Sequence, residues 1–117
     1  MTRSTVLVMA GLAALTLAAG PLGAQTPAAA PDGAQLYTRS CASCHGASGA
    51  PSAAMLRSMP ALPDFSNART LAGKADSALV NVITNGKGRA MPAYGTRLTP
   101  EQVRAIVRHM RTLSRPQ

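Results

Sequence analysis

The sequence predicts an all-α fold in a single small domain. Apolar residues recur at three- and four-residue spacings in three segments, no segment has the strict alternation of a strand, and one segment carries a complete helix start signal. The chain has 117 residues, of which 46% are hydrophobic but only three are aromatic. Its 9 Pro, 10 Gly and 14% charged residues exclude a coiled coil, and the moderate hydrophobicity excludes a protein with several membrane spans.

The first residues are typical of a secretory signal peptide. Arg3 precedes an uncharged run at residues 6–19, which Gly20, Pro21 and a small-residue site at residues 22–24 follow. The run is shorter than the roughly 20 apolar residues that span a bilayer. We therefore predict a signal peptide at residues 1–24, with an uncleaved anchor as the alternative, a flexible lead at residues 25–31 and one domain at residues 32–117. Export predicts a periplasmic location.

A mature domain of this size needs a stabilising element beyond its apolar core. A chain of about 90 residues buries only about 60–70% of its unfolded surface, which leaves it marginally stable. Domains this small are usually held by a disulfide, a metal or a covalent cofactor. The sequence must therefore supply one of these.

The first predicted helix begins at Asp32, whose side chain can accept hydrogen bonds from the helix N-terminus. The positions that recur at helical spacing, and so place both cysteines on one face, are Gly33, Leu36, Tyr37, Cys41 and Cys44. Residues 46–73 contain three prolines among Ser and Ala, so they are expected to be mostly loop, with one short helical turn at residues 53–57.

The second predicted helix spans residues 76–85. Leu79, Val82 and Ile83 form its apolar stripe, and Gly86 is suited to a left-handed C-terminal cap. A glycine-rich loop at residues 86–97 follows. The helix therefore ends where the chain turns sharply.

The third predicted helix has the clearest start signal. Thr99 and Gln102 form a capping box, Pro100 fits the first helical position, and Leu98 and Val103 occupy the positions of a hydrophobic staple. Its apolar side carries Val103, Ile106, Val107 and Met110, and its basic side carries Arg104, Arg108, Arg111 and Arg115. One face of this helix is therefore expected to pack and the other to face solvent.

One motif in the chain carries chemistry. The chain has two cysteines, Cys41 and Cys44, and His45, one of its two histidines, directly follows Cys44. This pattern is the signature of c-type haem attachment. Thiols three residues apart on a helical turn can form thioether bonds to the two vinyl groups along one porphyrin edge. His45 then lies beneath the iron as its proximal ligand, so haem c would supply the missing stabilisation.

Three other interpretations of the cysteine pair are weaker. A thioredoxin-like redox pair needs a βαβ setting, which the pattern lacks. A zinc site could recruit Cys41, Cys44 and His109, but His45 directly adjoins Cys44, whereas zinc ligand pairs are usually a few residues apart. A disulfide between the two cysteines would close a tiny loop and constrain little of the unfolded chain.

The sequence resembles the small monohaem class I c-type cytochromes of bacteria. The segments that carry the resemblance are GAQLY, CASCHG and, further along the chain, NGKGRAMPAYGTRLTPEQVRAIV; together they extend over residues 33–113. The resemblance implies about three main helices plus loops around one covalently bound haem. It also implies that Met91 is the second axial ligand, opposite His45, in a loop that Pro92 stiffens. Methionine with histidine is a known axial pair of electron-transfer cytochromes.

The resemblance assigns roles to other side chains as well. Met59 also precedes a proline, but the family pattern does not place a ligand there, so it is expected to fill space against the haem. Phe65 and Tyr94 would be walls of the haem pocket. His109 stands where the family commonly has an aromatic residue, at the crossing of the C-terminal and N-terminal helices near Tyr37, so we expect it to pack there.

The predicted function is that of an exported c-type cytochrome that carries single electrons between redox proteins. Its cofactor would be one haem c with its iron. No catalytic residues are expected, because Asp32, Asp76 and Glu101 are explained by helix N-termini, only Asp64 is left unassigned, and no carboxylate pair or nucleophile with a base remains. The alternatives are a haem-based gas sensor or small peroxidase with an openable sixth coordination site, and a fixed subunit of a dehydrogenase or oxidase complex. If the chain is not a subunit of such a complex, we expect a soluble monomer, and anchoring to the membrane is the alternative.

The positive charge suggests the chemistry of the partner. The formal net charge is +8. Nucleic acid is not expected, because the chain is exported, has few aromatic residues and carries no recognition motif. The arginines of the third helix, together with Lys87, Arg89 and Arg97 near the Met91 loop, could steer docking onto an acidic redox protein.

Overall fold

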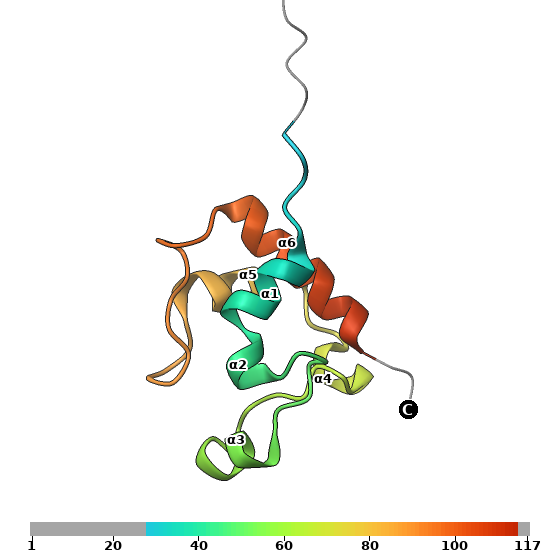
Figure 1. The fold of residues 1–117 in the computed structure, drawn as a ribbon, viewed down its shortest axis with the longest axis vertical. Helices are drawn as coiled ribbons and strands as arrows, with labels where there is room; N and C mark the ends of the chain where they lie inside the picture. The colour runs from blue at the N-terminus through green and yellow to red at the C-terminus, as the bar shows by residue number, and fades with distance from the viewer. Residues whose placement is uncertain (1–27, 115–117) are drawn as a thin grey trace, which may run out of the picture.

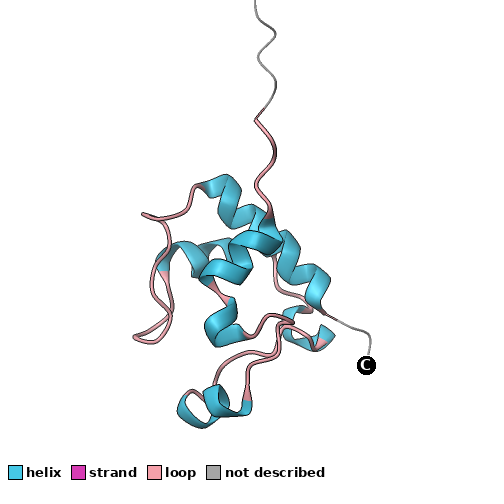
Figure 2. Cartoon of the chain, viewed as in Figure 1, coloured by secondary structure: helices cyan, strands magenta, loops and turns pink. Residues whose placement is uncertain are grey.

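The computed structural model describes residues 28–114. The predicted signal peptide at residues 1–24, and the first part of the predicted lead, lie outside the described residues. Figure 1 shows the helices of the described part in chain order: α1 (Gly33–Ser40), α2 (Ala42–His45), α3 (Ala53–Ser58), α4 (Ala68–Leu71), α5 (Asp76–Asn85) and α6 (Pro100–Leu113). The connections between these helices are loops, as Figure 2 shows. The all-α fold is confirmed.

The first helix is shorter than predicted. Asp32 caps α1 as expected, its Oδ1 accepting the amides of Ala34 and Gln35 at 2.9 and 3.1 Å. The helix then ends at Ser40, and Cys41 leaves helical geometry with φ −122° and ψ −34° before α2 begins at Ala42. The expectation that both cysteines share the face of one continuous helix is therefore wrong.

A distant hydroxyl contacts the chain at this interruption. In a continuous helix the Ser40 carbonyl would accept the Cys44 amide. Here the Tyr94 hydroxyl donates to the Ser40 carbonyl at 2.8 Å, and the Cys44 amide donates to the Cys41 carbonyl at 3.2 Å. The cysteine motif consequently lies at a bend in the chain.

The segment between His45 and α5 contains two short helices. The predicted turn at residues 53–57 is confirmed as α3, where the Ser52 hydroxyl accepts the Met55 amide at 3.2 Å. Helix α4 was not predicted; it begins after Asn67, whose side-chain oxygen accepts the Arg69 amide at 3.0 Å. An asparagine before Ala-Arg-Thr-Leu is a capping signal that could have indicated this turn.

The second and third predicted helices are confirmed. Helix α5 has the predicted bounds, but Gly86 adopts φ 76° with ψ 179°, an extended conformation at positive φ and not the left-handed helical cap. At the start of α6, Thr99 accepts the Gln102 amide at 3.2 Å and Gln102 accepts the Thr99 amide at 2.9 Å, which completes the predicted capping box. Within residues 28–114, no helix combines the length and the apolar character that a membrane crossing needs.

Helix α6 forms the centre of the core by packing against α1 and α5. The predicted apolar face is buried, and Ala105 is buried with it. Gly33 allows the two helix backbones to meet, because a Cβ placed there would lie 2.1 Å from the Ala105 carbonyl oxygen. His109 lies at the predicted crossing, where its ring centroid is 5.2 Å from that of Tyr37.

We expect Gly33→Ala to destabilise the protein. The added methyl group would force α1 away from α6, and overpacking of this kind costs about 1–3 kcal/mol, which exceeds the gain in helix propensity. Denaturant unfolding of the haem-loaded protein measures the loss. Gln35→Ala, at an exposed position of the same helix, is the control. Equal stability of the Gly33→Ala variant and the unaltered protein would show that the crossing relaxes freely.

Candidate functional site

A cavity of about 530 Å³ brings the predicted site residues together. Cys41, Cys44, His45 and Met91 all line it, although Met91 is far from the others in sequence. The remaining lining is mostly apolar and includes Met59, Leu62, Pro63, Phe65, Leu71, Leu79, Ile83, Tyr94 and Met110. The site is therefore an apolar chamber into which two thiols, one imidazole and several thioethers face.

The Cys41 thiol is a poor nucleophile in this setting. Cys41 and Cys44, both within the described residues, are free thiols. Burial, together with the nearby Cys44, raises the pKa of the Cys41 thiol to about 11. A thioredoxin-like pair needs a thiol with a depressed pKa. The structure therefore does not favour the redox-pair interpretation.

The environment of His45 suits a metal ligand. Its ring stacks on Phe65, with centroids 4.8 Å apart and planes inclined by 21°, which limits rotation of the imidazole. Burial lowers the His45 pKa, so the ring is neutral at physiological pH, the form that ligates metals. Its Nδ1 is buried with no hydrogen-bond partner among the described residues. Such a nitrogen is costly to bury unless a ligand or a partner satisfies the ring.

Met91 is placed by a short turn between α5 and α6. The Lys87 amide donates to the Met91 carbonyl at 2.9 Å, and the Met91 amide donates back to the Lys87 carbonyl at 3.3 Å. Gly86 precedes this turn, and a Cβ there would lie 2.6 Å from the Met91 carbonyl oxygen. Met91 is half-buried and lines the cavity.

Two tyrosines fix the backbone around the cysteine motif. The Tyr37 hydroxyl donates to the Gly46 carbonyl at 2.9 Å, directly after His45. The Tyr94 hydroxyl donates to the Ser40 carbonyl, directly before Cys41. Burial raises the pKa of both phenols, so both hydroxyls stay protonated and able to donate. Tyr94 thus connects the Met91 loop to the cysteine segment.

Part of the cavity wall was not predicted from the sequence. Met59, which was expected to fill space against the haem, lines the cavity, but residues 60–63, which were expected only to be loop, line it as well. Thr70, Leu71 and Lys74 contribute more of the lining. Prolines indicate a loop, but nothing in the local pattern indicates where that loop packs.

The arginines of α6 do not form a uniform solvated stripe. Arg104 pairs with Glu101 at 2.6 Å on the helix surface. Arg111 turns toward the segment between α4 and α5 and pairs with Asp76 at 2.8 Å, so its assignment to a free basic face is wrong. Arg97 lies over the Tyr94 ring, 4.5 Å from its centroid. Arg115 lies outside the described residues.

Comparison with known proteins identifies the family of this chain. Residues 28–110 match the family described as cytochrome c oxidase, cbb3-type, subunit III. The chain belongs to this family. It is therefore a c-type cytochrome domain with the class I fold, as the resemblance implied.

Two curated cbb3-type subunits are similar to the chain. The Cbb3-type cytochrome c oxidase subunit FixP of Azorhizobium caulinodans is 33% identical over 94 residues, which are 80% of this chain and 30% of that protein. Subunit CcoP of Azospirillum brasilense is 33% identical over 86 residues, which are 74% of this chain and 29% of that protein. The chain therefore spans less than a third of the length of these relatives.

A solved structure has the same fold at its full length. The c-type cytochrome KustC0563 superposes with a TM-score of 0.64 at 31% identity, covering 72% of this chain and 99% of that one. A c-type cytochrome binds haem c covalently through its porphyrin, and the haem carries the iron. The thiols at the cavity, the neutral imidazole and the apolar lining of this cbb3-family domain fit that cofactor.

We expect Tyr94→Phe to lower the free energy of unfolding by about 1 kcal/mol, because a partly buried carbonyl at Ser40 loses its donor. Denaturant unfolding of the haem-loaded protein measures this. Ser58→Ala removes a hydroxyl bond of 3.1 Å that is local to α3 and exposed, and it should leave stability unchanged. A Tyr94→Phe variant as stable as the unaltered protein would show that the Tyr94 bond adds nothing to stability.

Proposed function

We propose that this domain carries single electrons between redox proteins through haem c, attached by Cys41 and Cys44 and ligated axially by His45 and Met91. One observation supports this more than any other: all four residues line the same apolar cavity, although they come from two separate segments. We also propose that the chain is exported to the periplasm, which the sequence of residues 1–24 supports.

The residues of the chain have separate tasks in this proposal. Haem iron, when bound, cycles between two oxidation states. Cys41 and Cys44 would fix the cofactor at the bend between α1 and α2. His45 would offer a neutral ring nitrogen, while Phe65 stacks on the ring and holds its orientation. The Met91 thioether would raise the reduction potential relative to a harder ligand.

The apolar lining would serve electron transfer by keeping water away from the cofactor. Leu71, Leu79 and Ile83 are buried, and each lines the cavity. A dry, low-dielectric pocket disfavours additional positive charge, which favours the reduced state. A pocket that is packed in advance also reorganises little when an electron arrives.

The test is the optical spectrum of the reduced, haem-loaded protein before and after carbon monoxide is added. We expect no change, because both axial positions are filled. Met91→Ala should open one position, so that its spectrum shifts promptly with carbon monoxide and its reduction potential falls. Met59→Ala is the matched control, since Met59 also lines the cavity and is not a proposed ligand.

Other outcomes would redirect the proposal. A prompt shift in the unaltered protein would mean that the iron is accessible, which favours a gas sensor or a small peroxidase. A shift in Met59→Ala but not in Met91→Ala would reassign the ligand. A spectrum without haem bands would exclude both the carrier and its rivals.

The partner of this domain is proposed from charge and from the relatives. Lys74 and Lys87 line the cavity, and Arg89 is exposed in the adjacent loop, so the cavity lining and its surroundings carry positive charge. The relatives FixP and CcoP are subunits of cbb3-type oxidases. We propose that the domain delivers electrons to an acidic surface of such an oxidase.

Electron transfer to a purified cbb3-type oxidase should slow as ionic strength rises, because salt screens the attraction. At low salt, Lys87→Gln should transfer electrons more slowly than the unaltered protein. Arg104→Gln should have a smaller effect, because the charge of Arg104 is already paired with Glu101. A salt-independent rate, together with stable co-purification, would instead mean that the domain is a fixed subunit of the complex.

A further inference from the structure

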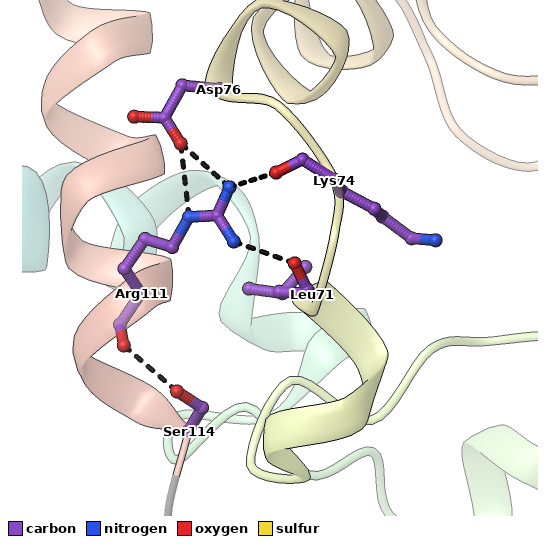
Figure 3. A network of polar contacts seen from close by, with 5 residues as sticks. All are labelled: Leu71, Lys74, Asp76, Arg111 and Ser114. Atoms are coloured by element: carbon purple, nitrogen blue, oxygen red, sulfur yellow. Dashed lines mark hydrogen bonds and ion pairs between the residues drawn. The ribbon is translucent and has the colours of Figure 1, made fainter.

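A single guanidinium on α6 holds the whole connection between α4 and α5 (Figure 3). Arg111 donates through Nε and Nη2 to Asp76 Oδ1 at 3.0 and 2.8 Å, and through Nη1 to the Leu71 carbonyl at 2.8 Å. Nη2 also donates to the Lys74 carbonyl. These acceptors extend from the last residue of α4 to the first residue of α5. Arg111 therefore fastens residues 71–76 to α6 at three points.

The fastened segment is also a wall of the cavity. Leu71 and Lys74 line the cavity, together with the preceding Thr70. Leu71 is only 3% exposed, and its carbonyl accepts the Lys74 amide at 3.2 Å as well as the Arg111 guanidinium. Met110, next to Arg111 on α6, lines the same cavity. The bonds of Arg111 thus determine how far this wall stands from α6.

We infer that Arg111 is a positioning residue that closes the wall at residues 70–74 against the haem and thereby raises the reduction potential. The inference rests on the proposed placement of haem in this cavity. A wall that closes tightly excludes water, and a drier pocket disfavours the more positively charged oxidised state. Loosening the wall should therefore lower the potential without removing either axial ligand.

The geometry requires arginine at this position. A planar guanidinium can direct several N–H groups at separate acceptors, whereas a lysine ammonium is a point charge on a flexible stem. Lysine would keep the positive charge near Asp76 but could not hold Leu71, Lys74 and Asp76 together. A role in positioning and a role in charge therefore predict different results for Arg111→Lys.

The experiment compares Arg111→Gln, Arg111→Lys and Arg104→Gln in the haem-loaded protein. Amide hydrogen exchange at Lys74 and the reduction potential are the two measurements. We expect both Arg111 variants to exchange the Lys74 amide about tenfold faster, because hydrogen bonds to a charged donor are lost. We also expect both to have a lower potential than the unaltered protein. Arg104→Gln, which loses only a surface pair, should change neither measurement.

Three results would overturn the inference. Unchanged exchange in Arg111→Gln would mean that the wall does not depend on Arg111. Faster exchange with an unchanged reduction potential would mean that Arg111 only stabilises the structure of residues 71–76. Restoration of both measurements by Arg111→Lys would mean that charge alone matters.

A further variant separates this inference from the proposed function. Leu71→Ala widens the wall directly, whatever Arg111 does. If Leu71→Ala lowers the potential and Arg111→Gln does not, the haem placement holds and the inference is wrong. If neither lowers the potential, the wall at residues 70–74 does not face the haem, and the placement of the cofactor is wrong with it.

Discussion

At Gly33 the backbones of α1 and α6 approach so closely that no side chain fits between them. This contact sets the distance between α1 and α6 where they cross, and the placement of the rest of the site depends on that distance. Further along α6, Met110 lines the cavity and Arg111 contacts the wall at residues 71–76. Further along α1, the chain reaches Ser40 and the cysteine motif. A small change in the crossing would therefore move two sides of the cavity at once.

The second determining contact links the two halves of the site. The Tyr94 hydroxyl donates to the carbonyl directly before Cys41, where α1 has ended, and the same residue lies three positions after Met91. The proposed attachment residues and the proposed distal ligand are therefore connected by one hydrogen bond as well as by the cavity they share. The bend at Cys41 thus lies where the two halves of the site meet.

Local signals in the sequence predicted much of this structure. The capping box at Thr99, the cap at Asp32 and the apolar stripe of α5 each depend on residues within one or two turns, and each was correct. The cysteine and histidine motif is equally local, and it led to the family that the comparison then showed. Where the physical cause of a structural feature lies within a few residues, the sequence pattern contains the signal for that feature.

Three of the differences have a different cause. The Ser40 carbonyl, directly before the helix break, accepts a hydrogen bond from a tyrosine 54 residues away, and Arg111 binds acceptors that are 35 to 40 residues away. Periodicity places Arg111 on the polar side of α6, but it contains no information about which carbonyls that side meets. For the same reason, the prolines at residues 60 and 63 predicted a loop and not a wall of the cavity.

The half-buried cysteines bear on how the holoprotein is made. Thiolate is the reactive form of cysteine, and burial raises the pKa of the Cys41 thiol to about 11, so in the folded chain this thiol stays protonated at neutral pH. In the unfolded chain the same thiol is solvated and ionises more readily. In the proposed haem protein, attachment at Cys41 would therefore be easier before α6 crosses α1 and the cavity forms.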